Sequence, residues 1–190
     1  SKILPLNDIV YENKISFNKK LNSNYEELIL LSRHDGNENK SIVEIRNINT
    51  FEKLHVYDPN ISDLIKNSKS EDLKYFKRFY MWHPIVTSDG GLIIKNNSSL
   101  IKIDFNSKLV WINDEREYNH STEIDSEGNI YVPGWKRYLS KQVADYVGTK
   151  SSKINNEYIF KDDHINIINK YGKMLFSKSV AEIFIENGYG

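Results

Sequence analysis

The sequence has 190 residues, of which 39% are apolar and 12% aromatic, so we expect one folded, soluble domain and not a disordered chain. Its 26 basic and 26 acidic side chains give a formal net charge of zero, which provides no long-range attraction for nucleic acid or anionic lipid. The absence of cysteine excludes disulfide bonds and thiolate zinc sites, and an apolar run such as residues 28–31 is far too short to span a membrane.

The first predicted elements are hairpins. Residues 42–57 contain two apolar runs on either side of a polar segment, which predicts two antiparallel strands joined by a turn. Residues 83–112 contain two such hairpins in succession: a strand, an Asp-Gly turn and a strand over 83–94, then alternating residues 100–104 and a return strand after the turn at 106–108. The expected unit is therefore a set of four antiparallel strands.

The same unit is repeated over residues 120–176. Residues 120–132 again give a strand, an acidic turn with glycine and a strand, and residues 164–176 give the second hairpin. Ile103, Lys108 and Trp111 correspond to residues 168, 173 and 176, at a constant spacing of 65 residues. Two insertions, with helix signals at 58–78 and a polar excursion at 134–156, account for the long spacing, and residues 179–187 predict a short helix.

Repeated four-stranded antiparallel units predict an all-β fold of the β-propeller type. About two to three blades fit into residues 1–190, which we treat as one partial propeller domain. Because a closed propeller typically has four to eight blades, the remaining blades are expected from a longer chain or another subunit. The abrupt end after the last helix favours a fragment, while assembly of several copies, or sheets packed as a sandwich, are the alternatives.

Five histidines are the main candidates for chemistry, because nucleophile elbows, phosphate-binding glycine loops and paired-histidine zinc motifs are absent from the sequence. His83 and His120 hold the same position in the repeat, directly before an apolar strand, and equivalent positions in a propeller meet at its axis. Imidazoles gathered there serve as nucleophile, acid–base group or anion ligand. The simpler interpretation is that each caps a strand. His34, His55 and His164 are expected at the surface or at a strand edge.

Cofactors and metals are not expected. Residues 35–39 resemble the opening of a calcium loop, but Lys40 and Arg46 stand where that loop requires Gly and Glu. Basic and aromatic residues alternate over 74–82, as in proteins that bind single-stranded nucleic acid, but in a neutral chain we expect this segment to pack on a sheet.

Part of the chain resembles the arylsulfotransferase (arylsulfate sulfotransferase) family, over roughly residues 80–190. The resemblance is carried by residues 83–84, 89–92, 100–104, 109–111, 119–121, 125–132 and 167–176, and by the helix that follows them. It implies a six-bladed, periplasmic or otherwise exported propeller that moves a sulfuryl group between phenols through a histidine intermediate, without a nucleotide donor. The implied partners are a small aromatic sulfate ester or a phenol.

Only two site residues follow from this resemblance. His120 matches a family histidine that opens an inner strand and helps to bind sulfate, and His83 lies at the analogous place one blade earlier. No segment matches the family's nucleophilic histidine or sulfate-binding arginine, so activity would require the missing blades. The contrasting hypothesis is a propeller without enzymatic activity that binds a protein or glycan through its loops, with Trp135, Tyr138 and Tyr146 as contacts. A quinoprotein-like propeller is the weakest alternative, because no recurrent tryptophan-docking motif is evident.

Overall fold

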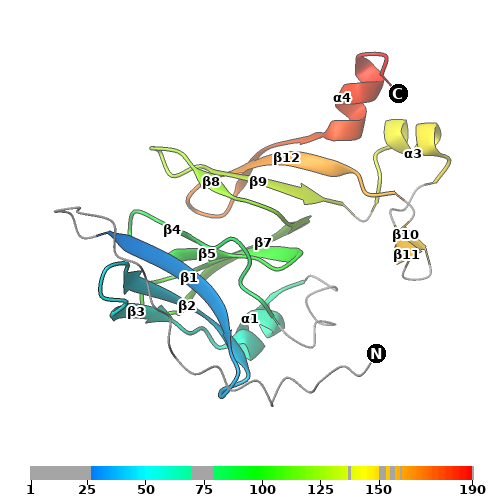
Figure 1. Cartoon of the computed structure of the whole chain (residues 1–190). Helices are drawn as coiled ribbons and strands as arrows, with labels where there is room; N and C mark the ends of the chain where they lie inside the picture. Colours follow the sequence, from blue (N-terminus) through cyan, green and yellow to red (C-terminus); the bar gives the residue numbers. More distant parts are fainter. Residues whose placement is uncertain are drawn as a thin grey trace.

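A computed structural model describes residues 27–69, 79–136, 138–149, 153–154, 157–158 and 160–189. The described chain is mainly antiparallel β structure, with a three-stranded sheet, an eight-stranded sheet, a small two-stranded pair and short helices (Figure 1). No closed barrel is formed by these strands. The prediction of an all-β fold is therefore confirmed.

The strands form three consecutive groups, which we call units A, B and C. Unit A consists of β1 (Leu28–Asp35), β2 (Lys40–Asn47) and β3 (Lys53–Tyr57). Unit B consists of β4 (Ile85–Val86), β5 (Leu92–Ile94), β6 (Ser98–Ile103) and β7 (Leu109–Tyr118). Unit C consists of β8 (Glu123–Ile124), β9 (Ile130–Trp135), β12 (Asp163–Ile168) and β13 (Met174–Ser179). β10 (Lys153–Ile154) and β11 (Glu157–Tyr158) form the separate pair.

Within each unit, every strand pairs with the next strand of that unit. In unit B the order is β4-β5-β6-β7, and in unit C β8 pairs with β9, β9 with β12 and β12 with β13. These are the two pairs of hairpins predicted at residues 83–112 and 120–176. The end of β7 also pairs with β9, at Glu117–Trp135 and Tyr118–Gly134, which joins units B and C into the eight-stranded sheet.

Two hydrophobic cores lie on opposite faces of β5 and β6. On one face, Leu92, Ile94 and Ile101 pack with Val43 and Tyr57 of unit A. On the other face, residues of unit B pack with strands of unit C, and the buried members are Ile93, Leu100, Tyr118, Ile130, Val132 and Ile168. Because side chains alternate across a strand, the apolar residues of β5 and β6 serve both cores. The three units therefore pack in sequence, face to face.

Three short helices interrupt or follow the strands. α4 (Val180–Glu186) is capped at its N-terminus by Ser179, whose hydroxyl accepts from the Glu182 amide, so the predicted helix at 179–187 is confirmed. α1 (Ile61–Asn67) lies in the first insertion and α3 (Lys141–Val147) in the second. Parts of both insertions, including residues 70–78, lie outside the described residues. None of the described helices is long and apolar enough to cross a membrane.

Candidate functional site

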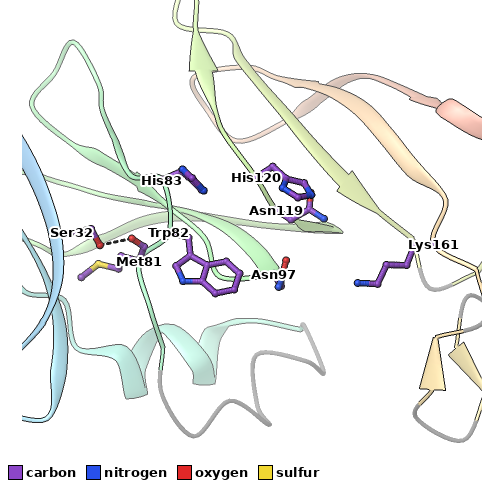
Figure 2. A pocket seen from close by; sticks show the side chains of 8 residues that line it. All are labelled: Ser32, Met81, Trp82, His83, Asn97, Asn119, His120 and Lys161. Atoms are coloured by element: carbon purple, nitrogen blue, oxygen red, sulfur yellow. Dashed lines mark hydrogen bonds between the residues drawn. The ribbon is translucent and has the colours of Figure 1, made fainter. Parts of the chain in front are cut away.

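A cavity of about 630 Å³ opens at one end of units B and C (Figure 2). Ser32 of β1 contributes to its lining, and the other lining residues come from the segments that lead into β4 and β8, from the β5–β6 connection and from the segment before β12. These segments share one end of the sheets because successive antiparallel strands reverse direction. The lining residues are Ser32, Met81, Trp82, His83, Asn97, Asn119, His120 and Lys161.

His83 and His120 line this cavity together, and their backbones are built alike. Both residues are exposed and have a left-handed backbone conformation, with a φ of 43° for His83 and 52° for His120. The residue before each histidine donates its backbone amide to a carbonyl of its own unit: Trp82 donates to Lys95, directly after β5, at 3.0 Å, and Asn119 donates to Pro133 in β9 at 3.2 Å. The equivalence expected from the repeat is therefore present in three dimensions.

The left-handed backbone at these histidines is a strained conformation for residues other than glycine. Asn97, a third lining residue, also has a positive φ of 48°. Strain of this kind persists only where the surrounding structure holds it, and it is concentrated at functional sites. Three strained lining residues around one cavity therefore mark it as the leading candidate site.

Amide groups at the cavity have unused hydrogen-bonding capacity. Asn119 is 7% exposed, and no described residue lies within hydrogen-bonding distance of its Oδ1. Asn96, beside Asn97, is 1% exposed, and neither its Oδ1 nor its Nδ2 has a partner among the described residues. Buried polar atoms are usually paired, so unpaired atoms next to a cavity indicate a polar ligand.

Two lysines add positive charge. The Lys161 side chain points toward the cavity from the segment before β12 (Figure 2), and its Nζ lies 5.4 Å from the centre of the Trp135 ring. Lys95 does not line the cavity and is 1% exposed; its carbonyl accepts from the lining residue Trp82, and its Nζ donates to the Thr122 hydroxyl. Burial lowers the pKa of Lys95 to about 8. Thr122 is two residues after His120, so Lys95 connects the two histidine-bearing segments.

The lining suits an oxyanion attached to an aromatic group. It combines two imidazoles, two amides and an ammonium group and includes no carboxylate, so its charge and donors favour a negative ligand. Trp82, which is 42% exposed, offers an aromatic face for a ring. Among the described residues, no group of three His, Asp or Glu side chains is arranged to hold a metal ion.

Sequence reasoning selected His83 and His120 for this cavity but missed its other polar groups. Lys95, Asn96 and Asn97 follow directly on the apolar run of β5. A lysine and two asparagines at the end of a buried strand are the signal that was available. No such signal marks Lys161, because it follows the second insertion and lies outside the repeated strand and turn pattern.

Two further predictions about site residues are wrong. Trp135, expected as a surface contact, is 2% exposed and packs under Lys161, whereas Tyr138 and Tyr146 are exposed as expected. His164, expected at the surface or at an edge, lies in β12 between two paired strands. Its Nε2 is 3.3 Å from Asp162 Oδ2. Its Nδ1 is 3.1 Å from Ser177 Oγ, which accepts from Arg116 of β7, so this arrangement depends on the packing of unit C against unit B, which the local pattern does not reveal.

The remaining predicted features lie elsewhere. His34 and His55 are partly buried in unit A and do not line the cavity. Of the basic and aromatic segment at 74–82, residues 74–78 lie outside the described residues. A scan against protein-family models found no matching family and a search of curated proteins found no matching protein, so the cavity is interpreted from its own residues.

Proposed function

We propose that this chain is part of an arylsulfotransferase-like β-propeller, and that its cavity binds an aromatic sulfate ester. The observation that carries the proposal is the convergence of His83 and His120, at equivalent repeat positions, on one cavity rich in hydrogen-bond donors. The sulfate would lie against the imidazoles and the Lys161 ammonium group, with its ring on Trp82. An exported location, as in the family that the sequence resembles, belongs to the same proposal.

The packing of the sheets supports the propeller. Units B and C are four-stranded antiparallel sets, and the three units stack face to face through the two cores. The cavity lies at the end where the innermost strands β4 and β8 begin, which is the end at which segments of successive blades meet around a propeller axis. Remaining blades, from a longer chain or another subunit, would complete the ring and the site.

The proposed reaction is sulfuryl transfer through a histidine. An imidazole nitrogen attacks sulfur, the bond from sulfur to the phenol oxygen breaks, and the phenolate leaves and takes up a proton. The acceptor phenol gives up its proton, attacks the sulfuryl group and restores the imidazole. His83 and His120 are the proposed catalytic residues, as ligands that stabilise the charge on the sulfuryl oxygens or as proton-transfer groups, and the nucleophilic histidine would come from the missing blades.

Titration calorimetry with 4-nitrophenyl sulfate tests the binding step. We expect His83→Ala and His120→Ala each to weaken binding about tenfold, since a lost hydrogen bond to a charged group costs roughly 1.5 kcal/mol. Tyr138→Ser, at an exposed position outside the cavity, is the matched control. Turnover of the ester by the complete protein, with and without His120→Ala, tests the chemistry. Unchanged affinity in both histidine variants would refute the proposal.

A binding module without enzymatic activity is the second candidate. It is favoured by a cavity of about 320 Å³ between α3 and α4, whose lining includes Tyr146, Phe184 and Tyr189. These exposed rings offer contact area to a protein or glycan. In that case Tyr146→Ser together with Tyr138→Ser would abolish partner binding, and the histidine variants would leave it unchanged.

A further inference from the structure

The outer hairpins of the three units are built around related turns, of which the turn in unit A is one residue longer than the other two. In all three turns, a side-chain oxygen of Asn or Asp accepts backbone amides that follow it, and a residue with positive φ comes before the return strand. The accepting residues are Asn47, Asp104 and Asn169. The residues with positive φ are Phe51, Ser107 and Gly172.

An aromatic ring follows at one fixed place on the return strand. Backbone hydrogen bonds close each turn. The backbone N–H of the Asn or Asp donates to the carbonyl of the residue directly before the return strand, which is Glu52 in unit A, Lys108 in unit B and Lys173 in unit C. Three residues later stand His55, Trp111 and Phe176. These three rings are therefore equivalent in the structure as well as in the repeat.

The ring of unit A contacts the turn of unit B. His55 stacks on Phe105, which lies inside that turn, with ring centres 3.8 Å apart. Close by, the Asp58 amide donates to the Ser107 hydroxyl at 2.9 Å. The outer edge of one unit is thus attached to the outer turn of the next.

The ring of unit B makes the same connection to unit C. Trp111 packs directly on Gly172, and its Nε1 donates to the Lys170 carbonyl at 3.1 Å. Asn113, also on β7, donates to the Gly172 carbonyl at 2.8 Å. Gly172 and Lys170 correspond in the repeat to Ser107 and Phe105, so both interfaces use the same turn positions.

The ring of unit C lies on an open face of its sheet. Phe176 is 48% exposed and pairs with Ile167, which pairs in turn with Tyr131. Tyr131 and Ile165 on that face are exposed too, whereas the intervening Ile130 and Val132 point into the core. An exposed apolar sheet face of this kind marks a surface that another element covers.

We infer that Phe176 docks on the outer turn of a further four-stranded unit, not contained in these 190 residues, whose left-handed turn position holds glycine or another small residue. This continues the two interfaces already present and rests on the proposed propeller. A second copy of this chain fits less well. The corresponding turn of a second copy would be that of unit A, where the bulky Phe51 occupies the left-handed position under the Arg46 guanidinium group.

Photo-crosslinking in the protein as its own cells make it tests this inference. With p-benzoylphenylalanine in place of Phe176, mass spectrometry should find a crosslinked peptide that contains Asp or Asn followed three residues later by Gly or Ser. The same probe at Tyr138, exposed and outside this face, should not yield that peptide. A product with residues 47–52 of a second copy, with a peptide that lacks the turn, or no product would overturn the inference.

The outcome is separable from that of the proposed function. Binding of 4-nitrophenyl sulfate depends on the cavity residues, none of which lies on the face around Phe176. A failed crosslink with intact ester binding refutes the docking surface alone. The turn-containing product without ester binding supports the surface and refutes the proposed ligand.

Discussion

Trp111 packs so closely on Gly172 that a Cβ atom at position 172 would lie 2.7 Å from the indole ring. The glycine also has a φ of 84°, which L-residues with side chains rarely adopt. Glycine is therefore required at this position for two reasons: the turn of unit C needs a left-handed residue, and the Trp111 ring of unit B leaves no room for a Cβ atom. The contact couples the two units at their outer edge, and neither of its residues lines the cavity.

We expect Gly172→Ala to lower the free energy of unfolding by about 2–3 kcal/mol, because the methyl group is strained at this φ and displaces the indole ring. Gly148→Ala is the matched control. Its φ is 74°, but apart from its chain neighbours no atom of the described residues lies within 4 Å of an added Cβ, so only the cost of the φ, about 1 kcal/mol, remains. Chemical denaturation measures both variants. Equal losses would show that the contact with Trp111 contributes nothing.

The repeat made much of this fold predictable from the sequence. The spacing of 65 residues between Trp111 and Phe176 identified equivalent strands, because alternation and turn residues are local signals. Which surface each ring meets was not predictable, since the contact depends on how the units stack. Strand β1 lies outside the predicted hairpin at residues 42–57, although its partner is local: β1 and β2 form a hairpin whose turn brings Asp35 opposite Lys40.

The repeat also explains why only part of the site was predicted. Repetition singled out His83 and His120, whereas the amides and lysines around them come from connections of different length. The burial of Lys95 against Thr122 joins residues that are 27 positions apart, and nothing local indicates it. Sequence reasoning finds residues that recur in the repeat and misses those that only the stacking brings to the cavity.

Backbone strain at His120 can be separated from its chemistry. Glycine adopts a φ of 52° without cost, whereas alanine does not, so His120→Gly should be about 1 kcal/mol more stable than His120→Ala. Both variants should lose affinity for 4-nitrophenyl sulfate to the same extent, because both lack the imidazole. Thermal denaturation and calorimetry on the pair check this. An alanine variant as stable as the glycine variant would contradict the assigned strain.

Glu44 is expected to make stability depend on pH in the acid range. Its side chain is fully buried between Arg33, 2.9 Å away, and Arg46, 2.7 Å away. Burial raises the pKa of Glu44, but the hydrogen bonds from the two guanidinium groups outweigh it and lower the pKa to about 2. The stabilisation is therefore complete above the ordinary glutamate pKa, near 4.3, and is lost as pH falls toward 2.

Glu44→Gln should accordingly lower the free energy of unfolding by about 2 kcal/mol at pH 7, and by progressively less as the pH falls below 4. Urea unfolding at a series of pH values gives the difference from wild type. The exposed Glu52→Gln is the control and should change stability little at any pH. A constant difference between wild type and Glu44→Gln from pH 7 to 3 would contradict the ion-pair explanation.

Lys95 is expected to reduce stability while supporting anion binding. Its folded pKa of about 8 lies below the ordinary lysine value near 10.4, so between these values the unfolded chain binds a proton that the folded chain has released. Stability therefore rises with pH across this window. Below pH 8 the folded protein holds a charged, buried ammonium group, whose desolvation disfavours folding.

Lys95→Met removes that charge with a side chain of similar shape. At pH 7 we expect a gain of about 1–2 kcal/mol in stability, after allowing for the unpaired Thr122 hydroxyl, and no gain above pH 10.5. Affinity for 4-nitrophenyl sulfate should fall several-fold at pH 7, because a positive charge near the cavity lining is lost. Lys66→Met, whose side chain is 76% exposed, is the control and should change neither property. If Lys95→Met raises stability but leaves the affinity unchanged, Lys95 has no part in binding the ligand. A buried ammonium group that destabilises the fold contributes to the site only if its charge attracts the ligand.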